Sequence, residues 1–394
     1  MNQREVALGV LAECRDDLRT PLNAEERAAR PGGYPYWGSN SIQGYVDAYL
    51  VDGATVLLGE DGAPFFDRTK PVAFFVDEPI WPNNHVHVLK PRATTHGRWL
   101  TYALNAVDYS LYVKGSTRDK LNQAEMMTIR LPWIEFDQQR TMADYLDSAT
   151  AEIDAVLRKL ERLDDALRDR ARVAQTRSVF GLLVGERHSA ADAHSPLSGV
   201  PEHWDRTKFG YDFTESTERN GDDPPGPLLS ISEYRGVELN TRTEGQQASL
   251  DVSKYRVVRP GQLAANMMWL NHGGLGASSL TGYISPDYKA FWISDRFEPR
   301  YVHHLFRSSR YIDYFAAIAT GVRPNAQRVT KTVLDATPVP LPPLDEQIRI
   351  ADELDEATTR VDAMLAKVAD LKSLLLERRA ALITDVVTGK KEVA

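Results

Sequence analysis

Two stretches of the chain, residues 142–167 and 350–375, carry apolar residues at alternating spacings of four and three positions. This heptad pattern is typical of a long helix that packs lengthwise against another helix. The positions predicted at the seam include Leu146, Ile153, Val156, Leu160 and Leu163 in the first stretch, and Leu354, Val361, Met364, Val368 and Leu371 in the second. The alternative interpretation is two unrelated helices, each docked on its own domain.

Residues that start and stop helices flank both stretches. Asp137 and Asp345 are suited to cap the first turn, and Gly181 and Gly389 lie where each helix is expected to end. About 44 residues at a rise of about 1.5 Å predict a helix about 65 Å long.

The two helical stretches are copies of one sequence. Residues 137–159 match residues 345–367 without a gap, and twelve of the 23 paired positions are identical, Gln139, Asp144 and Asp147 among them. An offset of 208 residues is far longer than a solenoid unit. It therefore indicates duplication of a whole module and an internal pseudo-two-fold repeat.

The blocks before the two helices have a different pattern. Short apolar runs alternate with clusters of Gly, Pro and Asn, which is typical of strands joined by turns. Strands are predicted at 54–58, 72–76 and 86–89 in the first block and at 228–231, 255–258 and 290–293 in the second, with helical stretches near 98–113 and 299–319. We predict an α+β fold with two sheet-containing domains, at 1–128 and 200–336, separated by two long antiparallel coiled-coil helices at 129–181 and 337–394, with a linker at 182–199.

Composition narrows the class of protein. The 394 residues include a single cysteine, Cys14, so no intrachain disulfide forms and a cytoplasmic location is expected. We expect neither a signal peptide nor a membrane span, because the first residues lack the basic and apolar regions of a signal and no stretch approaches 18 apolar residues.

The charge distribution adds a candidate binding surface. The formal net charge is −8, yet basic residues outnumber acidic ones by six to two in 90–120 and by eleven to four in 254–331. Electrostatic attraction to phosphate acts over about 10 Å, so a basic face binds DNA even on an acidic chain. These two stretches are therefore candidate DNA-facing segments.

No set of residues forms a complete catalytic motif. The fragment 223–226 ends in Gly226, where amino-methyltransferases carry an aromatic residue, and no glycine-rich cofactor loop precedes it. His272 is followed by two glycines, but the chain has no Gly-x-Ser-x-Gly elbow. His85 and His87 lack a third metal ligand nearby in the sequence, so we expect two partly exposed strand histidines. We expect a non-catalytic chain with no metal and no cofactor of its own.

Several segments resemble the specificity (S) subunits of type I restriction–modification systems, and together they cover nearly the whole chain. LPPLDEQIRIADELDEATTRVDAMLAK, within 341–389, closely resembles the conserved region of these subunits, and residues 131–181 resemble their central conserved region. VPEHW, GYISPDY and GVRPNAQRVTK in the second block resemble a target-recognition domain, as do YPYWGSNS and KGSTRDKLN in the first. The first block lacks a VPEHW-like opening, so its amino-terminal edge stays undefined.

The resemblance implies a function as well as a fold. Members of this family hold two target-recognition domains apart on two antiparallel helices, and each domain reads one half of a split double-stranded DNA site. The helices recruit two modification (M) subunits, which use S-adenosylmethionine to methylate adenine. Restriction (R) subunits join the complex to translocate and cleave DNA.

The loops that match the family motifs supply candidate DNA contacts. They are Tyr36, Ser39, Asn40, Lys114, Ser116, Thr117 and Arg118 in the first domain, and Asn266, Asn271, Arg323, Asn325, Gln327 and Arg328 in the second. Arginine pairs well with guanine and Asn or Gln with adenine, while other polar side chains hold phosphates. Trp37 and Trp269 are expected in the core rather than against bases.

Three other functions stay open on the sequence alone. The chain could serve a related phage-defence or methylation-only complex, or be a stand-alone DNA methyltransferase or nuclease. It could also be a coiled-coil adaptor that binds only protein. Methyl transfer by the pure chain would indicate the enzyme, and absence of DNA selectivity with partners present would indicate the adaptor.

Overall fold

The computed structural model describes residues 4–113, 119–182, 195–233, 235–241, 251–321 and 328–393. It divides into two compact units. Unit 1 comprises Met1–Arg162 and Lys367–Ala394, and unit 2 comprises Leu163–Ala366. Each unit contains one sheet-containing domain and a part of each long helix, α5 (Phe136–Val179) and α10 (Leu344–Val387).

Unit 1 is built on a four-stranded antiparallel sheet of order β2-β8-β5-β6. A second sheet has the order β4-β3-β7, and β1 pairs with β9. The strands are β1 (Glu5–Ala7), β2 (Ala12–Cys14), β3 (Tyr34–Trp37), β4 (Ile42–Val46), β5 (Thr55–Gly59), β6 (Ala73–Val76), β7 (Trp81–Pro82), β8 (Val86–Pro91) and β9 (Arg130–Pro132). The helices are α1 (Leu8–Leu11), α2 (Ala24–Ala28), α3 (Gly97–Asn105) and α4 (Gln123–Met126), with 3-10 turns at Asp16–Leu18 and Tyr109–Leu111.

Unit 2 repeats this plan with a four-stranded antiparallel sheet of order β11-β18-β15-β16. Three smaller sheets pair β10 with β19, β12 with β13 and β14 with β17. The strands are β10 (Asp205–Lys208), β11 (Phe213–Ser216), β12 (Leu229–Ser232), β13 (Gly236–Leu239), β14 (Arg256–Val258), β15 (Gln262–Ala265), β16 (Leu275–Ala277), β17 (Gly282–Ile284), β18 (Lys289–Ile293) and β19 (Pro338–Leu341). The helices are α6 (Phe209–Asp212), α7 (Pro299–Phe306), α8 (Ser309–Ile318) and α9 (Lys331–Asp335), with a 3-10 turn at Leu270–His272.

The two main sheets have the same strand order, so the hairpin β5–β6 of unit 1 corresponds to the hairpin β15–β16 of unit 2. All six strands expected from the sequence are present, each shifted by no more than two residues at either end. The helical stretch expected near 299–319 is two helices, α7 and α8, which meet at the buried Ser308. The α+β fold with a repeated sheet-and-helix plan is therefore confirmed.

In each unit the core extends from the sheet onto the long helices. In unit 1, Leu146 of α5 and Val386 of α10 share one buried cluster with Trp99 of α3. In unit 2, Val179 of α5 and Leu354 of α10 share a buried cluster with the phenylalanines of the sheet. The long helices thus complete both cores instead of lying on a finished domain surface.

The long helices have the expected length of 44 residues each. In unit 1 they run antiparallel, because Asp154 binds Arg379 at 3.0 Å and Glu161, further along α5, approaches the earlier residue Lys372 at 3.9 Å. Gly181 and Gly389 have left-handed φ values of 59° and 71°, as expected of residues that end a helix.

The expectation that aspartates cap these helices is wrong. Asp137 and Asp345 lie in the first turn, inside the helix, because α5 begins at Phe136 and α10 at Leu344. Their carboxylates still favour this end through the helix dipole.

Half of the predicted seam is buried and half is not. Leu146, Leu160, Leu354 and Val368 are at most 8 % exposed, and Ile153 and Val361 are half-buried. In contrast, Val156, Leu163, Met364 and Leu371 are 40–50 % exposed. At Val156 and Met364 the reason is that the next residues, Leu157 and Leu365, are the more buried ones, one position further along the helix than the pattern chose. Two adjacent apolar residues fit either register of the repeat, so the sequence did not decide between them.

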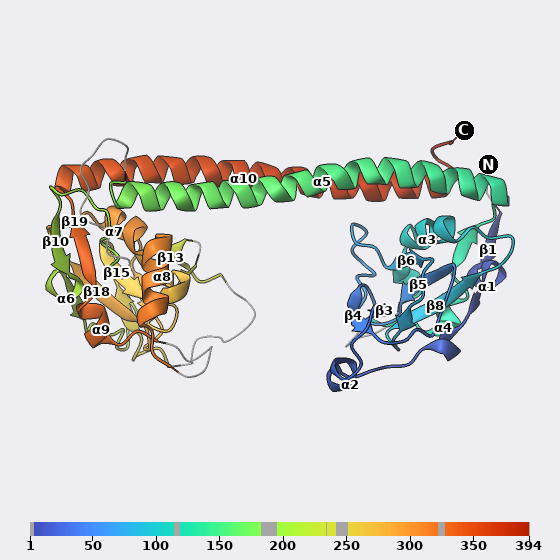
Figure 1. Cartoon of the computed structure of the whole chain (residues 1–394), viewed down its shortest axis with the longest axis horizontal. Coiled ribbons are helices and arrows are strands. Elements are labelled where there is room, and N and C mark those ends of the chain that lie inside the picture. The colour runs from blue at the N-terminus through green and yellow to red at the C-terminus, as the bar shows by residue number, and fades with distance from the viewer. Residues whose placement is uncertain are drawn as a thin grey trace. The chain divides into compact units, whose positions relative to one another are not determined.

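Identical residues of the repeat join each domain to its helix. In unit 1 the buried Gln139 accepts a hydrogen bond from the His96 amide at 2.7 Å. Arg98, in the first turn of α3, binds Asp144 at 2.6 Å and also binds Asp147. Helix α3 therefore lies directly against α5 (Figure 1).

Unit 2 has the same connection. The buried Gln347 accepts a hydrogen bond from the Glu298 amide at 2.9 Å. Arg300, in the first turn of α7, binds Asp352 at 2.7 Å and Asp355 at 3.1 Å. The identity of Gln139, Asp144 and Asp147 with their repeat partners thus has a structural cause.

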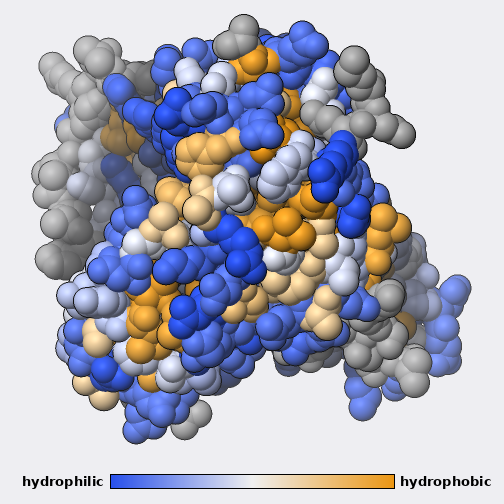
Figure 2. Space-filling view, turned by 90° about the vertical axis from the view of Figure 1, so that its right-hand side faces the viewer, coloured by the Kyte–Doolittle hydropathy of each residue, from blue (hydrophilic) through white to orange (hydrophobic). Residues whose placement is uncertain are grey.

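The surface carries scattered apolar groups. On the face shown in Figure 2, hydrophilic residues predominate and hydrophobic ones form small separate groups between them. No helix of the described part of the chain is both long and apolar enough to cross a bilayer.

Candidate nucleic-acid interface

In unit 1 the turn between β3 and β4 lies against the end of β5. The Gly38 amide donates to the Ser41 carbonyl at 2.9 Å and closes this turn. The Ser39 carbonyl comes so close to Gly59 that a Cβ atom there would meet it at 2.8 Å. Gly59 therefore lets the Ser39–Asn40 segment pack directly on the strand end.

The residues that follow β5 pair with a second candidate segment. The Leu121 amide donates to the Glu60 carbonyl at 2.8 Å, and Asp61 forms an antiparallel bridge with Lys120. Residues 119–121 directly follow Lys114–Arg118 in the sequence. The structure thus gathers the β3–β4 turn, the β5–β6 loop and the start of the segment at 119 in one region of unit 1.

Acidic groups in this region are neutralised by neighbouring cations. Glu60 binds Arg19, and Lys120 at 3.1 Å. Burial opposes ionisation, but the hydrogen bonds from Arg19 and Lys120 prevail and lower the pKa of Glu60. His85 lies 2.6 Å from a carboxylate oxygen of Asp61 and hydrogen-bonds to it. The Glu60 carboxylate, bound by two cations, therefore presents little unbalanced negative charge to a polyanion.

Unit 2 joins its two candidate segments in the same way. The Val329 amide donates to the Met267 carbonyl, in the β15–β16 loop, at 3.1 Å. Arg328 and Thr320 exchange two backbone hydrogen bonds of 3.0 Å. Val329 corresponds to Leu121 at the repeat offset of 208, and both are buried. A main-chain connection of the same kind therefore recurs in the two units, from corresponding donors to acceptors one position apart, because Glu60 corresponds to Met268 at the offset.

The candidate DNA contacts fall into three groups. Asn40 and Arg328 are exposed, and Ser39, Asn266 and Asn271 are partly exposed. Tyr36 is 2 % exposed, and its hydroxyl accepts a hydrogen bond from the Leu22 amide at 2.8 Å. Tyr36 is therefore a buried structural residue next to the turn and not an exposed candidate contact. The candidates that lie outside the described residues are Lys114, Ser116, Thr117, Arg118, Arg323, Asn325 and Gln327.

The two tryptophans expected in the core have different environments. Trp37 is 9 % exposed and belongs to a buried cluster with Val51, as expected. Trp269 is 53 % exposed, so the expectation of a core position is wrong. It lies in the loop after β15, where its neighbour Met267 is the residue that turns inward.

Sequence reasoning missed two features of this interface. Lys120 falls in the basic stretch 90–120 but was not singled out, although its partner Glu60 follows a predicted strand. The β5–β6 loop was missed entirely. Gly53 and Gly261 are 208 residues apart, which is the repeat offset, and strands β5 and β15 begin just after them. This spacing was the signal that the two strands, and the loops that follow them, are equivalent.

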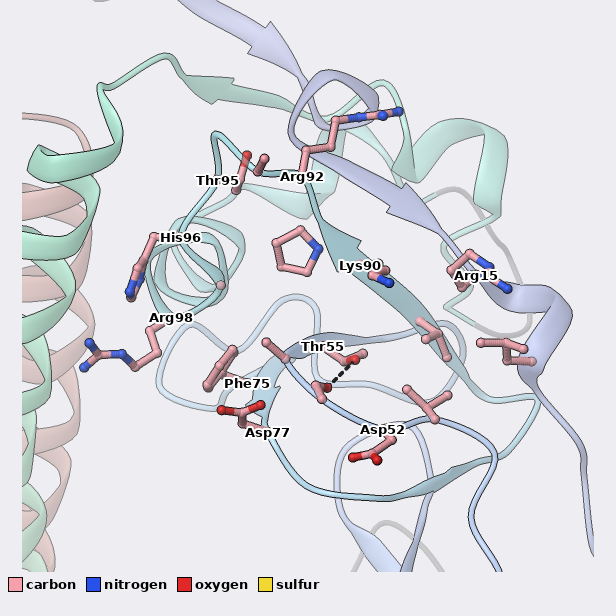
Figure 3. A pocket seen from close by; sticks show the side chains of 18 of the residues that line it. Arg15, Asp52, Thr55, Phe75, Asp77, Lys90, Arg92, Thr95, His96 and Arg98 are labelled. Atoms are coloured by element: carbon pink, nitrogen blue, oxygen red, sulfur yellow. Dashed lines mark hydrogen bonds between the residues drawn. The ribbon is translucent and has the colours of Figure 1, made fainter.

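A cavity of about 700 Å³ lies elsewhere in unit 1, near the start of α3 (Figure 3). Figure 3 shows Lys90 on its wall and Arg98 turned toward the long helices, where Arg98 binds Asp144. The lining has four basic residues, Arg15, Lys90, Arg92 and Arg98, and two acidic ones, Asp52 and Asp77. Arg15 and Arg98 bind Asp17 and Asp144, which are not part of the lining.

Cys14, Asp16 and His87 lie close enough to hold a metal ion, which corrects the view that His87 has no possible co-ligands. His87 is also fully buried rather than partly exposed. Its Nδ1 lies 2.6 Å from Asp16 and its Nε2 lies 2.8 Å from the Leu121 carbonyl, so both ring nitrogens are already engaged. Burial raises the pKa of the Cys14 thiol to about 11. These contacts describe a hydrogen-bonded core cluster rather than a set of available ligands.

Comparison with known proteins shows which family the sequence and the fold resemble. A family model described as the type I restriction modification DNA specificity domain matches residues 5–163. A putative type I restriction enzyme specificity subunit from Haemophilus influenzae is 31 % identical over 144 residues, or 36 % of each chain. The EcoKI specificity subunit of Escherichia coli is 29 % identical over 90 residues, 23 % of this chain and 19 % of that one. These matches span about a third and a fifth of the relatives' own lengths.

A solved chain shares the fold. It belongs to a structure described as showing complex assembly and conformational transition of the type I R-M system, and it matches with a TM-score of 0.65 at 15 % identity over 99 % of both chains. The family model, which covers residues 5–163, and these partial matches make the chain similar to the specificity (S) subunits of type I restriction–modification systems. The solved chain supports the same fold over almost the whole length.

Proposed function

We propose that this chain is the non-catalytic DNA-recognition subunit of a type I restriction–modification complex and that it reads a split double-stranded DNA site. Each unit contributes one target-recognition domain. The observation that carries the proposal is the recurring connection between loops, Leu121 to Glu60 in unit 1 and Val329 to Met267 in unit 2. A bipartite DNA site with two different halves requires two sets of loops that occupy equivalent positions but differ in amino-acid sequence.

The DNA contacts in this proposal come from the gathered loops. Ser39, Asn40 and Lys120 face DNA in the first domain, and Asn271 and Arg328 in the second, together with the sequence candidates at 114–118 and 323–327. The domain bounds are those of the sequence repeat, 1–128 and 200–336. Support comes from the exposure of Asn40 and Arg328 and from the neutralised Glu60.

The long helices carry the proposed docking sites for two M subunits. Val156 corresponds to Met364 and Leu163 corresponds to Leu371 at the repeat offset, and all four side chains are 40–50 % exposed. Apolar residues exposed at identical repeat positions indicate two copies of one partner. In the complex, S-adenosylmethionine belongs to the M subunits, which methylate adenine, and R subunits join to cleave.

Methylome mapping tests the DNA-reading proposal. The chain is co-expressed with its M subunit in a host without adenine methylation, and methylated sites are sequenced. We expect two short, different half-sites flanking a gap of fixed length. If Arg328 reads a base, Arg328→Ala is expected to relax one half-site only and Arg328→Lys should not restore it. If Arg328 holds a phosphate, Arg328→Ala should weaken binding to all sequences and Arg328→Lys should preserve it. One continuous site, or methyl transfer by the pure chain, would overturn the proposal.

Partner binding is tested separately. Replacing Val156 and Met364 by serine is expected to weaken M-subunit binding about tenfold or more, measured by titration calorimetry, with the chain's own melting temperature little changed. The matched control is Val173→Ser, since Val173 is 59 % exposed on α5 but has no apolar counterpart of similar size at its repeat position, Ala381. Equal effects of the test and control variants would contradict the assignment of this surface.

A further inference from the structure

An exposed apolar pair stands out in the second recognition domain. Met268 is 47 % exposed and Trp269 is 53 % exposed, side by side in a loop, whereas the similarly exposed Trp292, at 46 %, lies on strand β18 and Trp37, Trp81, Trp99 and Trp204 are at most 9 % exposed. Leaving an indole and a thioether side by side in water forgoes burial energy that the fold uses at those other tryptophans. This exposure therefore indicates a surface that is covered in a complex.

The loop that carries the pair is braced in one conformation. The Asn266 amide donates to the Gly274 carbonyl at 2.8 Å, and the Gly274 amide donates to the Trp269 carbonyl at 2.8 Å. The Asn266 side chain accepts from the Met268 amide at 3.1 Å. Gly273 has a left-handed φ of 72°, and a Cβ at Gly274 would meet Trp269 atoms at 2.7 Å. The two glycines thus permit a tight turn that fixes where Trp269 stands.

This loop is continuous with the proposed DNA-reading segment. Met267, just before the exposed pair, accepts the hydrogen bond from the Val329 amide. The exposed Arg328 directly precedes Val329 in the sequence. Arg328 is an exposed cation of that segment, whereas Arg259, Lys289 and Lys331 bind Glu218, Glu215 and Asp335. An apolar tip beside an exposed arginine matches DNA, in which apolar base faces lie between phosphates.

The first recognition domain has an equivalent feature. The loop between β5 and β6 corresponds to the loop between β15 and β16, because the two main sheets have the same strand order. In that loop Phe65 is 4 % exposed and Phe66 is 56 % exposed. Both loops therefore combine a buried apolar anchor with an exposed ring, although their sequences and lengths differ.

We infer that Met268 and Trp269 form an apolar wedge that stacks against bases of the DNA half-site read by unit 2. The inference rests on the proposed function. The backbone of the turn is fixed by hydrogen bonds and the indole packs against the His272 ring at a centroid distance of 4.9 Å, so the loop loses little conformational freedom on binding. Contact with a base step unstacks it locally, and the indole replaces part of the lost stacking. The wedge tolerates several base pairs but favours steps that unstack easily, so it adds shape-based selectivity to hydrogen-bond readout.

The test compares Trp269→Ala and Trp269→Phe with the unchanged chain, each assembled with its M subunit. The probe is a duplex bearing the methylome-determined site, with 2-aminopurine in the second half-site. We expect Trp269→Ala to bind about tenfold or more weakly and to lose the 2-aminopurine fluorescence rise, while Trp269→Phe keeps most of both. The slope of log affinity against log salt should stay unchanged, because no charge is removed.

Two controls make the outcomes distinct. Trp292→Ala removes a tryptophan that is 46 % exposed on strand β18 and should bind DNA normally. Arg328→Ala should lower both the affinity for DNA and the slope of log affinity against log salt.

Normal DNA binding by Trp269→Ala would overturn the wedge and leave the proposed function intact. Loss of M-subunit assembly with normal DNA binding would overturn it in favour of a protein contact. Absence of any sequence selectivity in the unchanged complex would instead refute the proposed function.

Discussion

Gln139 and Gln347 stand 208 positions apart and make the same three hydrogen bonds. Gln139 accepts from the His96 amide and donates to the Thr94 and Ile134 carbonyls at 3.1 and 2.7 Å. Gln347 accepts from the Glu298 amide and donates to the Arg296 and Pro342 carbonyls at 3.0 and 2.9 Å. Each glutamine therefore binds its recognition domain to its long helix through main-chain groups alone.

Removing one of these glutamines should destabilise its unit. Gln139→Leu leaves the His96 amide and a buried carbonyl without a partner, at a cost of about 1–3 kcal/mol in the free energy of unfolding. Urea denaturation of the full chain measures this. The matched control is Gln138→Leu on the neighbouring exposed position, which should change stability by less than about 0.5 kcal/mol. Equal effects at the two positions would show that the glutamine bridge contributes nothing.

Truncation of the seam should depend strongly on the register described above. Leu146→Ala is expected to cost about 2–5 kcal/mol, because Leu146 is fully buried in a cluster with Ile383 and Val386. Leu163→Ala is expected to cost far less, because Leu163 is 45 % exposed. Thermal unfolding followed by circular dichroism compares the two. Similar losses would mean that the heptad positions chosen from the sequence, and not the burial seen here, describe the packed helix.

Unit 2 should lose stability in mild acid. Burial lowers the pKa of His304, with Asp355 only partly opposing it, and burial lowers the pKa of His303 to about 3. The unfolded chain protonates histidine near pH 6.5, whereas the folded chain keeps these two neutral well below that. The stabilisation from His303 is therefore complete above about pH 6.5 and is lost as the pH falls toward 3, by up to about 1.4 kcal/mol per pH unit, and His304 contributes in the same direction.

Urea unfolding at pH 7.5, 6.0 and 5.0 measures this dependence. His303→Gln should flatten the decline, since glutamine does not titrate. A variant with the same slope as the unchanged chain would show that His303 is not the group responsible.

Cys14 should react slowly with thiol reagents. Burial raises the pKa of its thiol to about 11, and the nearby Asp16 carboxylate adds to the shift. Because the thiolate is the reactive form, iodoacetamide labelling at pH 8 should be roughly a hundredfold slower than in the urea-unfolded chain. Mass spectrometry of the labelled chain gives both rates. Equal rates would place the thiol in a freely accessible environment.

The sequence predicted the helices and strands of this molecule better than it predicted which side chains are exposed. Helix length, the glycines at 181 and 389 and the six strands depend on local pattern, and all were found. The exposure of Trp269 and the burial of Tyr36 depend on which side of a loop meets the core, and hydropathy gave the opposite answer for Trp269. Val156 and Leu157 are both apolar, so only three-dimensional packing decides which one turns inward.

The main-chain bond from Leu121 to Glu60, and its counterpart from Val329 to Met267, has an evolutionary consequence. A contact between amide and carbonyl does not depend on side-chain identity, so both partners can mutate while the loops stay attached. Only proline at position 121 or 329 removes the donor. Loops held in this way are free to diversify, and under the proposed function a lineage can acquire new DNA targets without rebuilding the scaffold that presents them.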